Sequence, residues 1–565
     1  MRKLVIAIIS LFCCTAQGQV CIDGRHVFVD SLTNTLLATI PEHLFGGDAT
    51  LTIAIEPGCQ EMVINGTTVV SSSSSDADTE SSATATYTFC NISAEQTWPV
   101  ALSFGNNKKQ EMSLQFTFLP VVQLNGSFNS DYQEGTFIFV CPDSAQTDTL
   151  TARIKWRGGS TNKPTKHKHN YKVKFDEDHT FLGMRNDNNW ILDAGQADIF
   201  RLRNRIAMNL WNDFNSKPYY ADQEPKARIG VSGQVVELFL NGKYHGIYNF
   251  SENLDRKQTK VKKVDKTTGD IRGCLYKVKN YGYGNMNDTV DIYDNHSETW
   301  NVIEAKYPDL EDADTTDWST LYNAINFVVF SSDEEFAEQV SDYFDLPVVV
   351  DISVFIATMG ALDNRGKNIL WAVHDKTQDK KLTPMPWDLD GTVGQEWMPD
   401  EYRIPEVLFD WQIGLTNRLT RNNVQGFNDL LNQRYKELRQ GLLTTDSLIG
   451  RYVSYYQLLT NSGAARRETD RWNHDSDVRG MEINFDATLD SISNWLTVHM
   501  QWMDGAWFPL DYWYEWYESQ LEGIATPLFT RRQEGVYTLG GQRLGDGQPL
   551  SPGIYIRNGR KVVVR

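Results

Sequence analysis

The sequence is poor in cysteine, in positive charge and in long hydrophobic runs. It has seven cysteines among 565 residues, and their spacing fits no zinc cluster. Lysine and arginine together number 54 against 73 aspartates and glutamates, so the net charge is −19. This charge argues against non-specific binding to nucleic acid or to an anionic membrane surface. Beyond the N-terminus no segment is long and apolar enough to cross a bilayer, so we expect no integral membrane span.

The first 18 residues have the pattern of a signal peptide. Arg2 and Lys3 precede an apolar stretch at 4–12, and Ala16-Gln17-Gly18 offers a small-residue cleavage site. We therefore expect a secreted or cell-surface protein. Export permits disulfides among the five cysteines that remain, but the sequence alone does not give their pairing. These are Cys21, Cys59, Cys90, Cys141 and Cys274.

The chain is too long for one hydrophobic core, and its pattern changes along its length. Residues 19–125 carry short alternating runs separated by turn residues such as Asn65-Gly66, which is typical of a small all-β sandwich. From about 140 strand-like segments come first, and helical patterns follow from about 316. Residues 348–359 should form a buried helix, and Ser332 with Glu335 marks the start of another. Strands followed by helices suggest a two-lobed α+β domain over 140–525, with a cleft between the lobes.

A basic segment interrupts the acidic chain at residues 151–175. It contains eight lysines and arginines, two histidines and no acidic residue. Basic and apolar residues alternate here, so strand geometry would place the basic ones on one face. Arg157 opens a Gly-Gly-Ser-Thr loop, and Lys172 and Lys174 follow on the next strand. We interpret this segment as a polyphosphate site, although a solvated strand face would have the same composition.

Acidic and amide residues gather in two later motifs, LDNRGKN at 362–368 and PWDLDG at 386–391. Asp363 and Asn368 have the D-x-x-x-x-N spacing of a kinase catalytic loop, in which Asp orients a hydroxyl and Asn binds metal. The hairpin expected between the motifs would place Asn368 opposite Asp388, about 5 Å apart. We therefore predict a Mg²⁺ or Mn²⁺ site at Asn368 and Asp388, with Asp390 as a further ligand.

A second interpretation of the later motif is open. Asp388-Leu389-Asp390-Gly391-Thr392-Val393 also fits the nucleophile loop of haloacid dehalogenase-type phosphatases. That loop follows a buried parallel strand, whereas Pro384 and Pro386 precede it here, and proline is poorly tolerated in a central strand.

Residues 235–250 predict a β-hairpin that turns at Asn241-Gly242. The segment that follows, 251–255, would cross between the lobes. Glu252 within it is a candidate to face the nucleotide, and an exposed turn carboxylate is the alternative.

Seven segments, in this order, resemble the CotH kinase-like family of secreted atypical kinases. They are ARIKWRGGST, YKVKF, FLGMRNDNNWIL, IFRLRNRIAMNLW, VELFLNGKYHGIYNFSENLD, LDNRGKNILW and PWDLDGTVG. The resemblance implies a protein-kinase-like fold that transfers phosphate from ATP to Ser or Thr hydroxyls of an unidentified secreted or surface protein. It also implies roles for single residues: Asp363 is similar to the catalytic aspartate, and Asn368 and Asp388 to metal ligands. Lys172 or Lys174 is similar to the phosphate-binding lysine, and Arg157 is a further phosphate contact.

The sequence also departs from ordinary kinases. Ala361-Leu362 replaces His-Arg before the aspartate, and Leu389 stands in the place of Phe. Residues 185–223 contain no glutamate that could pair with the lysine, so Asp193 or Asp198 would have to substitute. A catalytically dead kinase fold that acts as a surface adhesin or glycan-binding protein is therefore the alternative. The aromatic residues between 502 and 517 could serve it as a carbohydrate platform.

The C-terminal residues 535–565 again predict short strands. The motifs VYTLGGQRL and LSPGIYIRNGRKVVV are similar to C-terminal sorting segments of exported Bacteroidetes proteins. The resemblance implies translocation across the outer membrane or retention at the cell surface.

Overall fold

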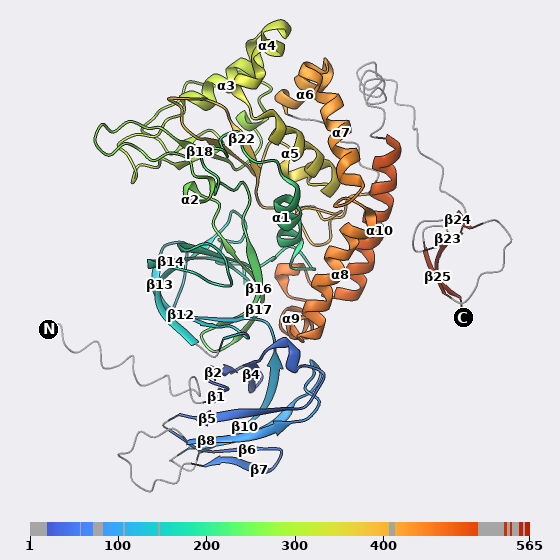
Figure 1. The fold of residues 1–565 in the computed structure, drawn as a ribbon. Coiled ribbons are helices and arrows are strands. Elements are labelled where there is room, and N and C mark those ends of the chain that lie inside the picture. The colour runs from blue at the N-terminus through green and yellow to red at the C-terminus, as the bar shows by residue number, and fades with distance from the viewer. Residues whose placement is uncertain are drawn as a thin grey trace.

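The computed structural model describes residues 20–506 without 57, 72–82, 105–107, 145–146 and 406–412, together with four short strands between 536 and 564. The expected signal peptide lies outside the described residues. Figure 1 shows a multi-domain molecule in which small sheets at one end adjoin a β-barrel, and a second sheet and the helices lie beyond it. The expectation of a multi-domain chain that mixes β and α structure is confirmed.

Two sheets enclose one core in the N-terminal part. The alternation of Leu51, Ile53 and Ile55 with exposed or half-exposed residues in β5 shows how one face of a strand supplies this core. The first sheet has the order β2 (Arg25–His26), β1 (Val20–Ile22), β5 (Ala49–Ile55), β8 (Ala83–Phe89). The second has the order β3 (Phe28–Asp30), β4 (Thr35–Thr39), β10 (Lys108–Thr117), β9 (Trp98–Phe104), β6 (Cys59–Ile64), β7 (Thr67–Ser71).

The next seven strands close into a barrel. Its order is β11 (Val121–Asn125), β12 (Gln133–Val140), β13 (Thr147–Arg157), β14 (Asn170–His179), β15 (Asp187–Asp193), β17 (Tyr244–Glu252), β16 (Gly233–Leu240). The parallel pairing of β11 with β16 closes it. The barrel thus begins at Val121, whereas the sequence pattern assigned residues up to 125 to the preceding domain. One neighbour of β11 is β12, but the other, β16, is more than a hundred residues away in sequence, which local pattern does not reveal.

The predicted hairpin turn at Asn241-Gly242 is confirmed between β16 and β17. Both turn residues have positive φ, 51° for Asn241 and 69° for Gly242. Asparagine and glycine tolerate this conformation, and it suits the twist of a two-residue hairpin.

A five-stranded sheet and a layer of helices follow the barrel (Figure 1). The sheet order is β19 (Thr299–Trp300), β20 (Ile303–Tyr307), β18 (Cys274–Val278), β21 (Ile369–Val373), β22 (Thr383–Pro386). The expected helix start at Ser332 is present, because its side chain accepts a hydrogen bond from the Glu335 amide at the start of α4 (Asp333–Tyr343). The expected core helix is α5 (Leu346–Met359), which is buried along almost its whole length.

The other helices precede this sheet in the sequence, lie between β20 and β21, or follow β22. They are α1 (Arg203–Phe214), α2 (Arg256–Thr259), α3 (Ser319–Phe330), α6 (Gly414–Arg421), α7 (Phe427–Arg439), α8 (Thr445–Asn461), α9 (Ala464–Trp472) and α10 (Phe485–Ala506). Most of the aromatic residues expected as a carbohydrate platform lie after 506, outside the described residues. Trp502, which is described, packs against the core. In the part of the chain that the structure describes, no helix has the length and apolarity needed to cross a membrane.

The C-terminal strands expected from the sequence are present. They are β23 (Val536–Thr538), β24 (Arg543–Leu544), β25 (Gly553–Arg557) and β26 (Arg560–Val564), and they pair in the order β24-β23-β25-β26.

Candidate active site

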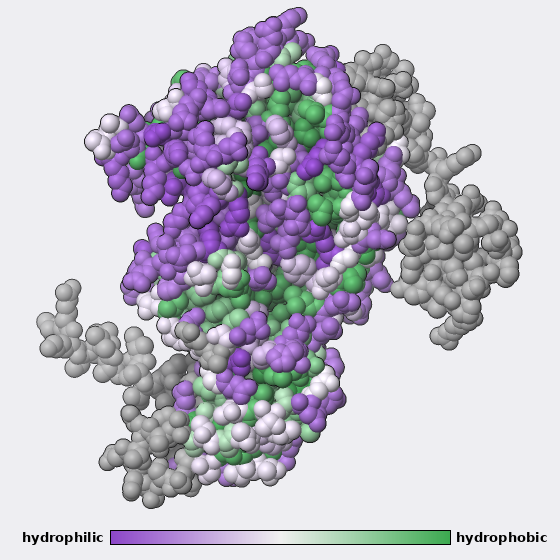
Figure 2. All heavy atoms as spheres, viewed as in Figure 1, coloured by the Kyte–Doolittle hydropathy of each residue, from purple (hydrophilic) through white to green (hydrophobic). Residues whose placement is uncertain are grey.

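A polar cleft lies between the outer face of the barrel, α1 and the loop after β22. Barrel strands point their apolar residues inward, so the alternate residues of β13, β14, β15 and β17 face outward. The surface in Figure 2 is mostly hydrophilic over the sheet that contains β18 and mixed over the barrel. Side chains from four parts of the chain line the cleft: Arg157, Asn170, Asp193, Asn204, Arg205, Asn249, Ser251, Trp387 and Asp388. The buried Oδ1 atom of Asn249 has no hydrogen-bond partner, which suits a site for a polar ligand.

Asp363 and Asn368 form a tight hydrogen-bonded unit at the end of α5. Asn368 donates its Nδ2 to Asp363 Oδ2 over 2.8 Å. Lys367 Nζ lies 2.8 and 2.7 Å from the two Asp363 oxygens, and Trp397 Nε1 lies 3.0 Å from Oδ1. Asn364 braces the unit, because its Nδ2 donates to the carbonyl oxygens of Asn368 and Trp387. The D-x-x-x-x-N spacing thus brings both side chains together.

The hairpin that connects the two motifs is present, but its register differs by one residue from the prediction. Ile369 pairs with Pro386, and the Trp387 amide donates to the Asn368 carbonyl over 2.9 Å. Asn368 therefore lies opposite Trp387, and its expected pairing with Asp388 is wrong. The prediction assumed a turn centred on residue 378, whereas the observed pairs Ile369–Pro386 and Ala372–Thr383 are centred between residues 377 and 378.

Asp388 and Asp390 occupy the loop after β22. Asp388 has a φ of 59°, and the loop is fixed by the Leu389 amide, which donates to Asn204 Oδ1 of α1 over 3.0 Å. The Asp388 side chain is exposed to solvent, but many protein atoms lie around it beyond its immediate contacts and reduce its hydration. This desolvation raises the pKa of Asp388, and nearby Lys277 opposes the shift. Desolvation and the charge of Asp388 together hold the pKa of Asp390 well above its usual range.

Four basic side chains lie near one another at this site: Arg157, which lines the cleft, and Lys172, Lys277 and Lys306. Desolvation, followed by the charges of Lys306 and Arg157, lowers the pKa of Lys172 to about 8. Desolvation and Arg157 likewise lower the pKa of Lys277 to about 8. Arg157 and Lys277 also lie over the Trp387 ring, 5.1 and 5.3 Å from its centroid. A polyanion would relieve this repulsion, so the cluster suits a polyphosphate.

The donor set fits a hard divalent cation. Carboxylate and amide oxygens are the ligands of Mg²⁺ and Mn²⁺, and a cation would relieve the repulsion between Asp388 and Asp390. Among the described residues, no three His, Cys, Asp or Glu side chains converge as a complete metal site. Such convergence is not required, since Mg²⁺ at a nucleotide is held by one or two carboxylates together with phosphates and water.

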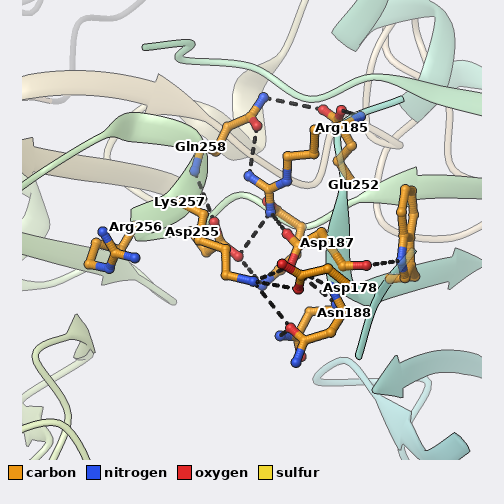
Figure 3. A network of polar contacts seen from close by, with 12 residues as sticks. Asp178, Arg185, Asp187, Asn188, Glu252, Asp255, Arg256, Lys257 and Gln258 are labelled. Atoms are coloured by element: carbon orange, nitrogen blue, oxygen red, sulfur yellow. Dashed lines mark hydrogen bonds and ion pairs between the residues drawn. The ribbon is translucent and has the colours of Figure 1, made fainter. Parts of the chain in front are cut away.

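Glu252 lies in a separate polar network rather than in the cleft lining. Its carboxylate is buried and accepts from Arg228 at 2.9 and 3.0 Å, and from the Arg185 and Ser232 amides at 2.9 Å. Figure 3 shows this network, in which Arg185 also reaches Asp255 and Lys257 pairs with Asp187. With both oxygens occupied by protein donors, Glu252 fixes the end of β17. A nucleotide contact by Glu252 remains a prediction that this geometry does not favour.

The other candidates are distributed as follows. Lys172 lies beside Arg157, whereas Lys174 is paired across the sheet with Arg153 and Asn189, farther along the strands. Asp193 lines the cleft, and its Oδ2 accepts from Asn204 over 2.7 Å. Asp198 instead is buried in an ion pair with Arg203. Of the two proposed substitutes for the missing glutamate, only Asp193 is therefore at the site.

Sequence reasoning missed several residues of this site: Lys277, Asn204, Trp387, Lys367 and Trp397. Lys367 carried a signal, because it precedes Asn368 directly and lies four residues after Asp363. Lys277 carried none, since it lies 86 residues before Asp363 and 120 residues after Arg157 in the sequence.

The topology also bears on the phosphatase interpretation. β22, which precedes Asp388, is the edge strand of its sheet and pairs antiparallel with β21. The nucleophile loop of those phosphatases follows a buried parallel strand, so the required context is missing.

Comparison with known proteins identifies the family of the chain. The family described as CotH kinase protein matches residues 154–503, which is more than half of the chain. The chain belongs to the CotH kinase family. No curated protein matches it.

Proposed function

We propose that this protein is an active kinase that transfers the γ-phosphate of ATP to Ser or Thr hydroxyls of a secreted or surface protein. The observation that carries the proposal is the composition of one cleft. Asp388 and Arg157 line it. The hydrogen-bonded pair Asp363 and Asn368 lies near Asp388, and Lys172 and Lys277 lie near Arg157. Acidic and basic groups arranged in this way suit phosphoryl transfer, in which positioning and charge stabilisation provide most of the catalysis.

Each residue has a definite task in this proposal. Asp363 accepts the hydrogen bond of the acceptor hydroxyl and takes its proton as the oxygen attacks the γ-phosphorus. The bond from that phosphorus to the β,γ-bridging oxygen breaks, and ADP leaves. Lys172 and Lys277 stabilise charge on the phosphates, and Arg157 supports them from the rim of the glycine loop.

Asp388 and Asn368 would hold Mg²⁺ or Mn²⁺, with Asp390 as a further ligand, and the ion would neutralise phosphate charge. Asn368 keeps its Nδ2 on Asp363, so its Oδ1 is the atom available as a ligand.

The N-terminal sequence supports action outside the cytoplasm, and the C-terminal sheet is in keeping with a sorting segment. We propose that the acceptor is a protein exported with this one or displayed at the same surface.

Intact-mass spectrometry of the mature protein after incubation with ATP and Mg²⁺ or Mn²⁺ tests the proposal. We expect phosphoryl adducts on the wild type and on an added protein acceptor. Asp363→Ala and Asp388→Ala should lower the rate at least about a hundredfold, because each removes a group that acts on the transferred phosphate or its acceptor.

Asp222→Ala is the matched control, since Asp222 is exposed and not part of the cleft lining. Undiminished transfer by folded Asp388→Ala protein would overturn its role as a metal ligand. ATP binding without transfer to any acceptor would instead indicate the dead kinase fold.

A further inference from the structure

The segment 394–404 carries three exposed apolar side chains, and one of them, Trp397, contacts Asp363. Trp397 is 55% exposed, Tyr402 47% and Ile404 67%. Only eight large hydrophobic residues in the described chain are exposed to this degree, and three of them lie within these neighbouring positions. Single exposed apolar residues are ordinary, but a cluster next to a catalytic group indicates a binding surface.

The segment is an ordered loop. Gln395 bridges to Tyr402, and the Arg403 amide donates to the Gly394 carbonyl over 2.7 Å. Arg403 also pairs with Glu396 at 2.9 Å, and its carbonyl accepts from Trp495 of α10 over 3.0 Å. The exposure of the three apolar side chains is therefore built into a fixed backbone.

Trp397 occupies a hydrogen-bonding position that the reaction needs. Lys367 and Asn368 come from the same turn as Asp363, so their hydrogen bonds belong to the built site. Trp397 Nε1, in contrast, reaches Asp363 Oδ1 over 3.0 Å from a different loop and with an exposed ring. It is the donor that an incoming hydroxyl can replace at the lowest cost.

We propose that this loop is the acceptor-binding surface and that it selects a Ser or Thr flanked by apolar residues. This inference rests on the proposed kinase function. The acceptor hydroxyl replaces the indole N–H at Asp363 Oδ1, and the flanking apolar side chain packs against Trp397, Tyr402 and Ile404. Trp397 is a specificity residue, and its N–H holds the place of the acceptor hydroxyl in the free protein.

Two synthetic peptides test the inference, one with serine flanked by leucine and one with serine flanked by glutamine. We expect wild type to phosphorylate the leucine peptide with a kcat/KM about tenfold higher, as packing of one leucine side chain would give. Trp397→Ala should reduce this preference to near parity and leave the KM for ATP unchanged. Trp397→Phe keeps the ring and should keep the preference. Phe330→Ala removes a matched exposed aromatic (63%) elsewhere and should change nothing.

A second readout does not need catalysis. N-bromosuccinimide oxidises exposed indoles, and peptide mapping by mass spectrometry follows Trp397 individually. The leucine peptide should slow oxidation of Trp397, and the glutamine peptide should not. Equal oxidation with both peptides, or an unchanged leucine preference in Trp397→Ala, would overturn the inference. Selective protection without any phosphate transfer would support the docking surface and count against the kinase function.

Discussion

At the scale of single residues, the cleft is defined by groups whose charges are not balanced locally. Lys172 is repelled by Lys306 and Arg157, and Asp388 and Asp390 repel one another. Lys277 is repelled by Arg157 and only partly compensated by Asp388. Unbalanced groups reduce the stability of the free protein and are typical of sites that bind a charged ligand.

The lysines give ATP binding a pH dependence with a definite sign. The pKa values of Lys172 and Lys277 are lowered to about 8, so both lysines lose their charge as the pH of the free protein rises through that value. Phosphates bind the charged forms, so binding above that pH must take up protons. The affinity for ATP should therefore fall between pH 7 and 9, by up to about tenfold per pH unit for each lysine.

Isothermal titration calorimetry with Mg²⁺-ATP at several pH values checks this prediction. Lys277→Met and Lys172→Met should each flatten the profile. Lys279→Met is the control, because Lys279 is half-exposed and paired with Glu304. A steep profile that persists in both variants would contradict the assignment.

At the scale of elements, helix α9 is fastened to the barrel by buried charge. Glu468 accepts from Lys168 at 3.0 Å, from Arg201 at 2.7 Å and from the Ile247 amide at 2.6 Å. Gly246 in β17 permits this approach, because a Cβ at that position would lie 2.1 Å from Glu468 Oε2. One carboxylate thus joins α9, the segment before β14 and β17.

Glu468→Ala should destabilise the protein by about 3–5 kcal/mol, because it leaves two buried cations without their partner. Urea unfolding followed by tryptophan fluorescence measures the change. Glu437→Ala in α7 removes a half-exposed glutamate and should cost less than about 1 kcal/mol. Equal stability of the two variants would show that Glu468 does not fasten α9.

At the scale of the whole molecule, the N-terminal sheets are joined to the barrel by a small apolar cluster. Phe28 stacks on Phe239 with ring centroids 5.3 Å apart, and the Tyr244 amide donates to Asp30 Oδ1 over 3.1 Å. Leu37, Val121 and Val140 complete the cluster. A continuous apolar contact of this kind should make the two parts unfold together.

Phe28→Ala should weaken this joint by about 3–5 kcal/mol and split one calorimetric transition into two, while ATP binding is unchanged. Leu32→Ala is the control, since Leu32 is exposed in the turn between β3 and β4 and is not part of this cluster. A single transition in Phe28→Ala would show that the joint does not depend on this ring.

The sequence by itself determined the features that depend on neighbouring residues. Turn chemistry specified the hairpin at Asn241-Gly242, and capping specified the helix start at Ser332. The D-x-x-x-x-N spacing brings Asp363 and Asn368 together, because a tight turn over five positions allows few other arrangements of the two side chains. The order of the motifs was enough to place the chain in its family.

Only the tertiary structure decided features that depend on distant strands and on register. The barrel closes through β11 and β16, and Lys277 reaches the cleft from β18, although neither segment carries a local signal. The register of β21 and β22 differs by one residue from the prediction, so Trp387 rather than Asp388 lies opposite Asn368. The turn fixes the register of a hairpin, and the sequence pattern did not give its geometry. The tertiary structure also buries the carboxylates of Glu252 and Asp198, and each is paired with an arginine. A buried carboxylate without such a partner would be strongly destabilising.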